Sequence, residues 1–119
     1  MIKYNKIMLS LLYVAVVFSS NPMRIVTIGG CVTETVFKLG LEENVVAVDL
    51  SSTSPSRVRD LPQVGYIRAI SSEGILSMSP SIILTTTDIG PPKVVEQIKD
   101  SGVVLEIFDS PHTYQDILT

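Results

Sequence analysis

Four short runs of β-branched and apolar residues recur along the chain, and other segments separate them. These runs are RIVTIGG (24–30), NVVAVDL (44–50), SIILTTT (81–87) and VVLEIFDS (103–110). Their hydrophobicity is nearly continuous instead of alternating, which is typical of strands buried on both faces of a parallel sheet. Where such strands alternate with helices, the fold belongs to the α/β class. The sequence therefore predicts a Rossmann-like parallel sheet with helices on both faces.

The segments between the strands carry helix and loop signals. In CVTETVFKLG (31–40), apolar residues recur at spacings of four and three, and a glycine stands at the C-terminal cap. SSEGILSMSP (71–80) begins with serines that can cap a short helix. GPPKVVEQIKDSG (90–102) starts with prolines and ends with a glycine, as helices often do. We expect a long loop at 51–68, which contains two prolines, and the start of another helix at 111–119.

The amino-terminus has the pattern of a secretory signal peptide. MIKYNK carries two lysines and no acid, residues 7–18 are apolar, and SSNPMR ends the apolar run. This run is shorter than the stretch of about 20 residues that a membrane-spanning helix needs. We therefore expect residues 1–20 to be a signal peptide, with no stable membrane insertion after cleavage, and residues 24–119 to form the exported domain. The alternative is that the run is a buried strand or helix of the domain.

Composition and single residues exclude several kinds of function. A formal net charge of −3 argues against a nucleic-acid-binding surface. Cys31 is the only cysteine, so an internal disulfide and a Cys/His metal motif are both excluded. It is separated from the apolar run by polar residues and proline, so we expect it to belong to the fold and not to a lipid attachment site. His112 is the only histidine, and no catalytic motif accompanies it, so an enzyme is not expected.

Gly29 and Gly30 follow the first predicted strand, where nucleotide-binding folds hold a phosphate at a helix N-terminus. Neither G-x-G-x-x-G nor G-x-x-x-x-G-K-[ST] is present. A tight strand-to-helix turn explains the two glycines equally well. A nucleotide-dependent α/β enzyme domain therefore stays as an alternative from a different functional class.

Tyr66 and Arg68 stand in QVGYIRAISSEGIL (63–76), and residues i and i+2 of an extended segment project to the same side. A phenol has a pKa of about 10, so a phenolate at neutral pH needs a ferric ion, and a nearby guanidinium adds to the effect. Tyrosinate is a known axial ligand of haem iron. Arg68 can donate to the phenolate or meet a haem propionate. The triplet alone is equally compatible with a surface tyrosine beside a solvated arginine.

Three stretches together resemble the ABC-transporter substrate-binding proteins that carry iron chelates, haem and cobalamin. The stretches are RIVTIGGCVTETVFKLGLEENVVAVD, DLPQVGYIRAISSEGILSMSPSIILTTTDIGPP and GVVLEIFDSPHTYQDIL, within residues 24–118. Inside that cluster, GYIRAISSEGILS (65–77) is similar to a feature of periplasmic haemin-binding proteins of bacterial haem uptake systems. The resemblance implies the N-terminal lobe of a two-lobed protein, truncated before the linking helix and the second lobe.

The resemblance also implies a role for each matching residue. Tyr66 matches the axial ligand of ferric haem, and Arg68 matches an arginine beside the phenolate. Glu73 matches a glutamate that docks onto arginines of the permease, although favourable placement in the first turn of a helix is an alternative. The implied function is periplasmic haem binding and delivery to an ABC importer, without catalysis. The alternative within the cluster is an iron-siderophore or cobalamin carrier, in which Tyr66 only lines the cleft.

Overall fold

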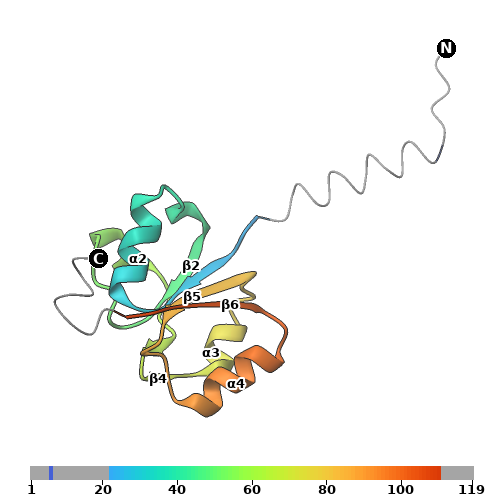
Figure 1. The fold of residues 1–119 in the computed structure, drawn as a ribbon. Helices are drawn as coiled ribbons and strands as arrows, with labels where there is room; N and C mark the ends of the chain where they lie inside the picture. The colour runs from blue at the N-terminus through green and yellow to red at the C-terminus, as the bar shows by residue number, and fades with distance from the viewer. Residues whose placement is uncertain (1–5, 7–21, 111–119) are drawn as a thin grey trace.

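A parallel sheet of four strands, in the order β2-β1-β5-β6, runs through the centre of the molecule (Figure 1). The structure is a computed structural model, and it describes residue 6 and residues 22–110. The strands are β1 (Ile25–Thr27), β2 (Val45–Val48), β5 (Ile82–Thr86) and β6 (Val104–Phe108). Every neighbouring pair in this sheet is parallel. The predicted α/β class with a Rossmann-like parallel sheet is confirmed.

Helices cover both faces of this sheet, as the sequence predicts. They are α2 (Gly30–Lys38), α3 (Ser72–Leu76) and α4 (Pro92–Asp100). Figure 1 shows α2 on one side of the sheet and α3 with α4 on the other. A 3₁₀-helix, η1 (Glu42–Asn44), leads into β2. None of the helices among the described residues is long and apolar enough to cross a membrane.

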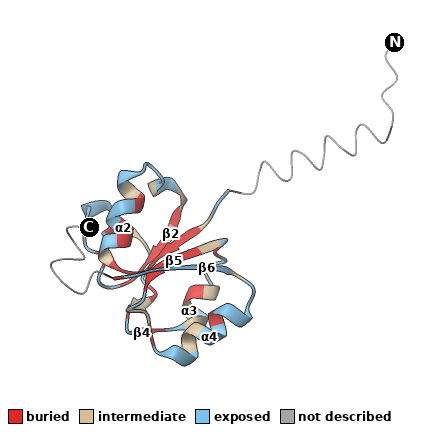
Figure 2. Cartoon of the chain, viewed as in Figure 1, coloured by how far each residue is buried: buried red, intermediate tan, exposed pale blue. Residues whose placement is uncertain are grey.

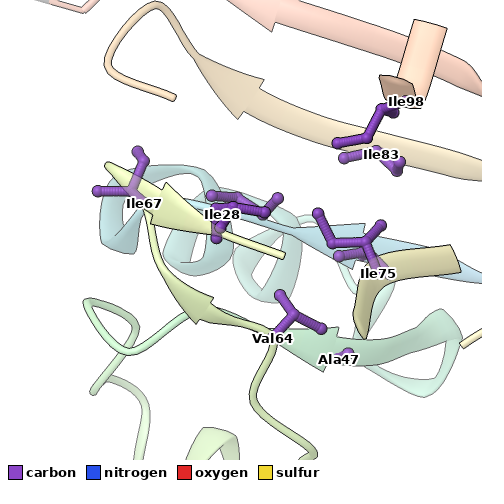
Figure 3. Packing of buried hydrophobic residues seen from close by; sticks show 9 residues of the cluster. Ile28, Ala47, Val64, Ile67, Ile75, Ile83 and Ile98 are labelled. Carbon is purple, nitrogen blue, oxygen red and sulfur yellow. The ribbon is translucent and has the colours of Figure 1, made fainter. Parts of the chain in front are cut away.

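Two clusters of buried apolar side chains hold these layers together. On one face, Val32 and Val36 of α2 pack with Ile25 of β1. On the other face, Ile75 of α3 and Ile98 of α4 belong to a cluster that also contains the residues labelled in Figure 3, namely Ile28, Ala47, Val64, Ile67 and Ile83. In Figure 2 the central strands are buried and the outward helix faces are exposed. The core therefore lies on both sides of the sheet, which is the arrangement expected for near-continuous apolar strands.

Strand β6 forms one edge of the sheet and differs from the inner strands in its exposure. Val104, Ile107 and Phe108 are all exposed, whereas Leu105 packs partly buried against the core. In the described part of the chain, β6 pairs with β5 alone. Its other side presents unpaired backbone groups next to exposed apolar side chains.

The segment 51–68 is more regular than the predicted long loop. It contains a 3₁₀-helix, η2 (Ser56–Asp60), and the strand β3 (Gly65–Tyr66), which pairs antiparallel with β4 (Ala69–Ile70). Strands of two residues are too short to show an alternating pattern, which is why sequence reasoning missed this hairpin. The predicted signal peptide (1–20) lies outside the described residues apart from residue 6, and the predicted helix at 111–119 lies wholly outside them.

The predicted glycine cap of α2 is confirmed at Gly40. Its φ of 80° lies in the left-handed region, which favours glycine. The Gly40 amide donates to the Phe37 carbonyl at 3.0 Å, and the Leu41 amide donates to the Val36 carbonyl at 3.2 Å. These two bonds form a Schellman motif, which satisfies carbonyls at the end of the helix.

We expect Gly40→Ala to lower the free energy of unfolding by about 1 kcal/mol, because a side chain is strained at this backbone conformation. A Cβ atom at Gly40 would meet nothing within 4 Å, so the effect isolates the backbone. Gly74→Ala, inside α3, is the matched control and should instead stabilise the protein by roughly 0.5–1 kcal/mol. Urea denaturation measures both, and equal effects of the two substitutions would contradict the assignment.

Candidate functional site

The loops that follow β1, β2 and β5 gather at the carboxyl edge of the sheet, where parallel α/β folds bind their ligands. Gly29 and Gly30 follow β1, residues 49–52 follow β2, and residues 87–90 follow β5. The β3–β4 hairpin, which carries Tyr66 and Arg68, is hydrogen-bonded to two of these loops. The predicted candidate residues therefore lie at the edge of the sheet where a ligand site is expected.

Backbone hydrogen bonds fix both strands of this hairpin. The Leu50 amide, just after β2, donates to the Gly65 carbonyl at 2.8 Å. On the other side, the Gly90 amide donates to the Ile67 carbonyl at 2.9 Å, and the Ile70 amide donates to the Gly90 carbonyl at 3.1 Å. The hairpin thus bridges the loops after β2 and β5, and its position follows the positions of these two strands.

The buried side chain of Ile67 anchors the tip of the hairpin. Ile67 is 8 % exposed and lies in the same cluster as Ile28 (Figure 3). Its neighbours in the chain point differently, because Tyr66 is 47 % exposed and Arg68 is also exposed. The anchored isoleucine leaves the side chains on either side of it available to a ligand.

Arg68 lies in a turn and not in an extended segment, which corrects the sequence-based expectation. Tyr66 pairs with Ala69, so Ile67 and Arg68 form a two-residue turn between β3 and β4. The expectation failed because the turn contains no glycine, asparagine or aspartate that would announce it. Tyr66 and Arg68 are nevertheless both exposed at this tip.

Asp88 places a negative charge next to Arg68. The Arg68 Nη2 atom lies 3.9 Å from Asp88 Oδ1, and the Ser110 hydroxyl donates to Asp88 Oδ2 at 2.7 Å. The ion pair is loose and solvent-exposed, so it leaves the guanidinium donors able to bind another group. Within the described part of the chain, the Tyr66 hydroxyl makes no hydrogen bond, and it is therefore open to a ligand.

A buried carboxylate, Asp49, organises the loops below the hairpin. It is 0 % exposed, and its Oδ1 atom accepts from the Gly29 amide at 2.9 Å and from the Ser52 hydroxyl at 2.8 Å. Its Oδ2 atom accepts from the amide and the hydroxyl of Ser51, at 3.2 and 2.7 Å. One carboxylate therefore joins the ends of β1 and β2, and its burial is compensated by several hydrogen bonds.

Buried hydroxyls extend this network into the sheet. Thr33 Oγ1 lies 2.6 Å from Ser52 Oγ and 2.8 Å from Thr27 Oγ1. Asp49 lies at the end of the second predicted strand and Ser52 in the predicted loop after it, and sequence reasoning missed this role. A signal for it was present in the sequence, because Asp49 directly follows an apolar strand and Ser51 and Ser52 come shortly after it. An aspartate buried at the end of such a strand needs hydrogen-bond donors nearby, and the two serines can supply them.

The Asp49 hydrogen-bond network argues against the alternative that Gly29 and Gly30 bind the phosphate of a nucleotide. The Gly29 amide, which would be available to a phosphate, is already bonded to the Asp49 carboxylate at 2.9 Å. A Cβ at Gly30 would lie 2.9 Å from the Ser51 carbonyl oxygen, so glycine is required here by close backbone packing. The tight-turn explanation of the two glycines accounts for both observations, and a buried negative charge at this point disfavours an anionic ligand.

The remaining candidate residues are separate from the hairpin tip. Ser71 is the cap of α3, because its hydroxyl accepts from the Gly74 amide at 3.1 Å, and Glu73 is exposed in the first turn. Cys31 is a free, exposed thiol at the start of α2. His112 lies outside the described residues. No group of three or more His, Cys, Asp and Glu side chains among the described residues could hold a metal ion.

These features define a ligand-binding α/β lobe, with a rigid hairpin that presents a phenol and a guanidinium at the carboxyl edge of the sheet. A family model described as "Periplasmic binding protein" matches residues 25–114. This chain belongs to the periplasmic binding protein family, which is a family of binding proteins that serve transport and not of enzymes.

Solved structures and sequence relatives agree with this assignment. The periplasmic haem-binding protein RhuT from Roseiflexus sp. RS-1 is 43 % identical, with a TM-score of 0.74 over 76 % of this chain and 35 % of that one. A periplasmic haem-binding protein from Pseudomonas aeruginosa is 36 % identical, with a TM-score of 0.75 over 81 % of this chain and 34 % of that one. The vitamin B12-binding protein of Photorhabdus laumondii is 30 % identical over 81 % of this chain and 34 % of its own length. The chain thus spans about a third of the length of these relatives.

We expect Asp49→Asn to destabilise the lobe by about 1–3 kcal/mol, because an amide nitrogen cannot accept from donors that the carboxylate binds. Urea denaturation of the wild-type and variant chains measures the difference. Asp60→Asn makes the same change at an exposed carboxylate and should alter stability by less than about 0.5 kcal/mol. A loss shared equally by both variants would show that charge alone, and not the buried network, is responsible.

Proposed function

We propose that this chain is the haem-binding lobe of a periplasmic binding protein, that Tyr66 ligates the ferric iron, and that the protein delivers haem to an ABC importer. One observation carries the proposal. The Tyr66 phenol is exposed on an anchored hairpin, in a lobe that is 43 % identical to a periplasmic haem-binding protein. The function is binding and delivery, and no catalytic step is involved.

Haem suits a site that offers a single strong ligand. The porphyrin supplies four nitrogen ligands, so the protein needs to supply only an axial group, and a tyrosinate oxygen is one of the known axial ligands. This matches a hairpin with one exposed phenol in a region of the described chain that has no metal-binding cluster. Arg68 carries a positive charge on the same tip, where it can stabilise the phenolate or pair with a propionate.

Asp88 gives Arg68 a defined but weak partner before the ligand binds. The separation of 3.9 Å and the exposure of both side chains make this pair easy to exchange for a propionate or phenolate oxygen. The Ser110 hydroxyl donates to Asp88 Oδ2 at 2.7 Å and so fixes the position of the Asp88 carboxylate. The carboxylate keeps the Arg68 guanidinium near the tip of the hairpin but forms only a weak ion pair with it.

The proposed site is one wall of a cleft. Such a wall leaves much of the porphyrin exposed, because binding pockets normally cover most of the ligand surface. This chain covers about a third of the haem-binding relatives, and the opposite wall of the cleft would come from the remaining two thirds of such a protein. We accordingly expect weaker haem binding by the 119-residue chain than by a complete two-lobed protein.

The family and the amino-terminal pattern support the proposed periplasmic location. The RhuT and Pseudomonas aeruginosa relatives are periplasmic haem-binding proteins by name. Residues 1–20 carry the charged and apolar regions of a signal peptide. Together these support export to the periplasm, with residues 24–119 as the N-terminal lobe of the binding protein.

A cobalamin carrier is the second candidate, and sequence relatives favour it specifically. The Photorhabdus laumondii protein and a Pectobacterium atrosepticum protein at 28 % identity are both vitamin B12-binding proteins. In such a carrier Tyr66 would only line the cleft, and the iron-ligand role would disappear. The higher identities to haem-binding structures, 43 % and 36 %, support haem as the first candidate.

We expect Tyr66→Phe to abolish the tyrosinate charge-transfer absorption of the ferric haem complex and to weaken haemin binding about tenfold or more, since the axial bond is lost. The measurement is an absorption titration of the 119-residue chain with haemin. Tyr66→His is the companion variant, because an imidazole at the same position restores an axial ligand and should give a different, histidine-type spectrum.

Two outcomes of this titration would overturn the proposal. An unchanged spectrum in Tyr66→Phe would show that another group ligates the iron. Displacement of haemin by a stoichiometric amount of cyanocobalamin, with equal competition in wild type and Tyr66→Phe, would assign the site to cobalamin instead.

Glu73 is proposed as a docking residue for arginines of the permease. It is exposed in the first turn of α3 and has no ion-pair partner in the described part of the chain. It lies on a different element from the hairpin, so a docked permease and a bound ligand would not compete for the same residues. Charge complementarity of this kind mainly sets encounter and register between partners.

We expect Glu73→Lys to lower haem uptake through the cognate importer about tenfold, because it replaces attraction to the permease by repulsion. Haemin titration of the same variant should match the wild type. Glu96→Lys, an equal charge change at an exposed position of α4, is the control. Normal uptake with Glu73→Lys, or equal loss with Glu96→Lys, would refute a specific docking role.

A further inference from the structure

Directly after β2, polar residues are buried and an apolar residue is exposed, which is the reverse of the usual arrangement. Asp49 and Ser52 are polar and yet 0 % and 2 % exposed, whereas Leu50 between them is apolar and 52 % exposed. A buried carboxylate is understandable here, because the surrounding amides and hydroxyls satisfy it. The exposed leucine has no such explanation within the lobe.

Leu50 is held outside by the backbone on both of its sides. Its own amide donates to the Gly65 carbonyl at 2.8 Å. The amide and the hydroxyl of the next residue, Ser51, both donate hydrogen bonds to Asp49 Oδ2, at 3.2 and 2.7 Å. Turning the leucine inward would break these bonds, so its side chain is committed to the surface at the carboxyl edge of the sheet.

The position of Leu50 relates it to the Tyr66 hairpin. The hydrogen bond to Gly65 places Leu50 beside the residue that immediately precedes Tyr66. The other large exposed apolar residues of the described structure lie on segments that make no hydrogen bond to the hairpin: Met23 before β1, Leu39 and Leu41 after α2, and Val104, Ile107 and Phe108 on the edge strand. Leu50 and Tyr66 are thus two exposed apolar side chains on segments that are hydrogen-bonded to each other at the carboxyl edge of the sheet.

We infer that Leu50 is a second ligand-contacting residue and packs against the apolar ring of the porphyrin whose iron is bound at Tyr66. The inference rests on the proposed haem-binding function and extends it to the organic part of the ligand. A leucine side chain makes no bond to iron, so its contribution comes from removing apolar surface from water. It should therefore be the same for a porphyrin with or without iron, unlike the contribution of Tyr66.

Fluorescence and absorption titrations with haemin and with iron-free protoporphyrin IX test this separation on the 119-residue chain. Leu50→Ala should weaken the binding of both compounds by a similar factor of about three to ten. Tyr66→Phe should weaken haemin binding while leaving protoporphyrin IX nearly unchanged. Leu39→Ala, which truncates a leucine that is 69 % exposed after α2, is the matched control and should affect neither. Thermal unfolding of each variant confirms that the fold is retained.

The possible failures are distinguishable. If Leu50→Ala binds both compounds like the wild type while Tyr66→Phe loses haemin, the Leu50 contact is refuted and the proposed function stands. If Leu50→Ala weakens haemin alone, a ring contact is likewise refuted. If Leu39→Ala weakens binding as much as Leu50→Ala, the effect is nonspecific and the inference fails. If the wild type binds neither compound, the proposed function fails and the Leu50 contact fails with it.

Discussion

The carboxylate of Asp49 is the interaction on which the ligand-binding edge depends. It accepts hydrogen bonds from the turn after β1, through Gly29, and from the loop after β2, through Ser51 and Ser52. Strands β1 and β2 are adjacent in the sheet but separated in the chain by α2 and η1. The Asp49 carboxylate therefore fixes the loop after β1 against the loop after β2 directly. The hairpin is hydrogen-bonded to Leu50, the next residue along, and to Gly90 after β5, so the Asp49 carboxylate supports one of its two attachments.

The site therefore separates into a buried frame and an exposed tip. The frame consists of the Asp49 network with Thr33 and the buried Ile67, and it is saturated with internal hydrogen bonds and apolar contacts. The tip consists of side chains that the frame holds in the solvent, above all Tyr66 and Arg68. Rigid presentation lowers the entropy cost of binding, because these side chains are attached to a backbone that is already ordered. A buried frame of this kind is compatible with relatives named for haem and for cobalamin.

Much of the fold could be predicted because its signals are local. The apolar runs marked the strands of the main sheet, and Gly40, Ser71 and Pro92 marked helix ends through conformational and capping preferences that act within a few residues. The hairpin could not be predicted in this way. Its turn residues, Ile67 and Arg68, lack turn preferences, and the turn is stabilised by tertiary burial of Ile67 and by bonds to Gly90.

The candidate site was predicted in part. Resemblance singled out Tyr66, Arg68 and Glu73, and the structure leaves all of them exposed. Asp49 was missed although its position after an apolar strand was a usable signal, and Leu50 could not be found, because local polarity predicts that the leucine and not the aspartate is buried.

The exposed edge strand β6 has a practical consequence for anyone who produces this lobe. Among the described residues β6 pairs on one side only, and Val104, Ile107 and Phe108 are exposed, an arrangement that favours addition of a strand from another molecule and is a common route to aggregation. Val104→Lys, at a residue that is 51 % exposed, would add a charge that opposes strand addition at the edge strand, on a different element from the hairpin. Such a variant would give a more soluble starting material for spectroscopy and crystallisation.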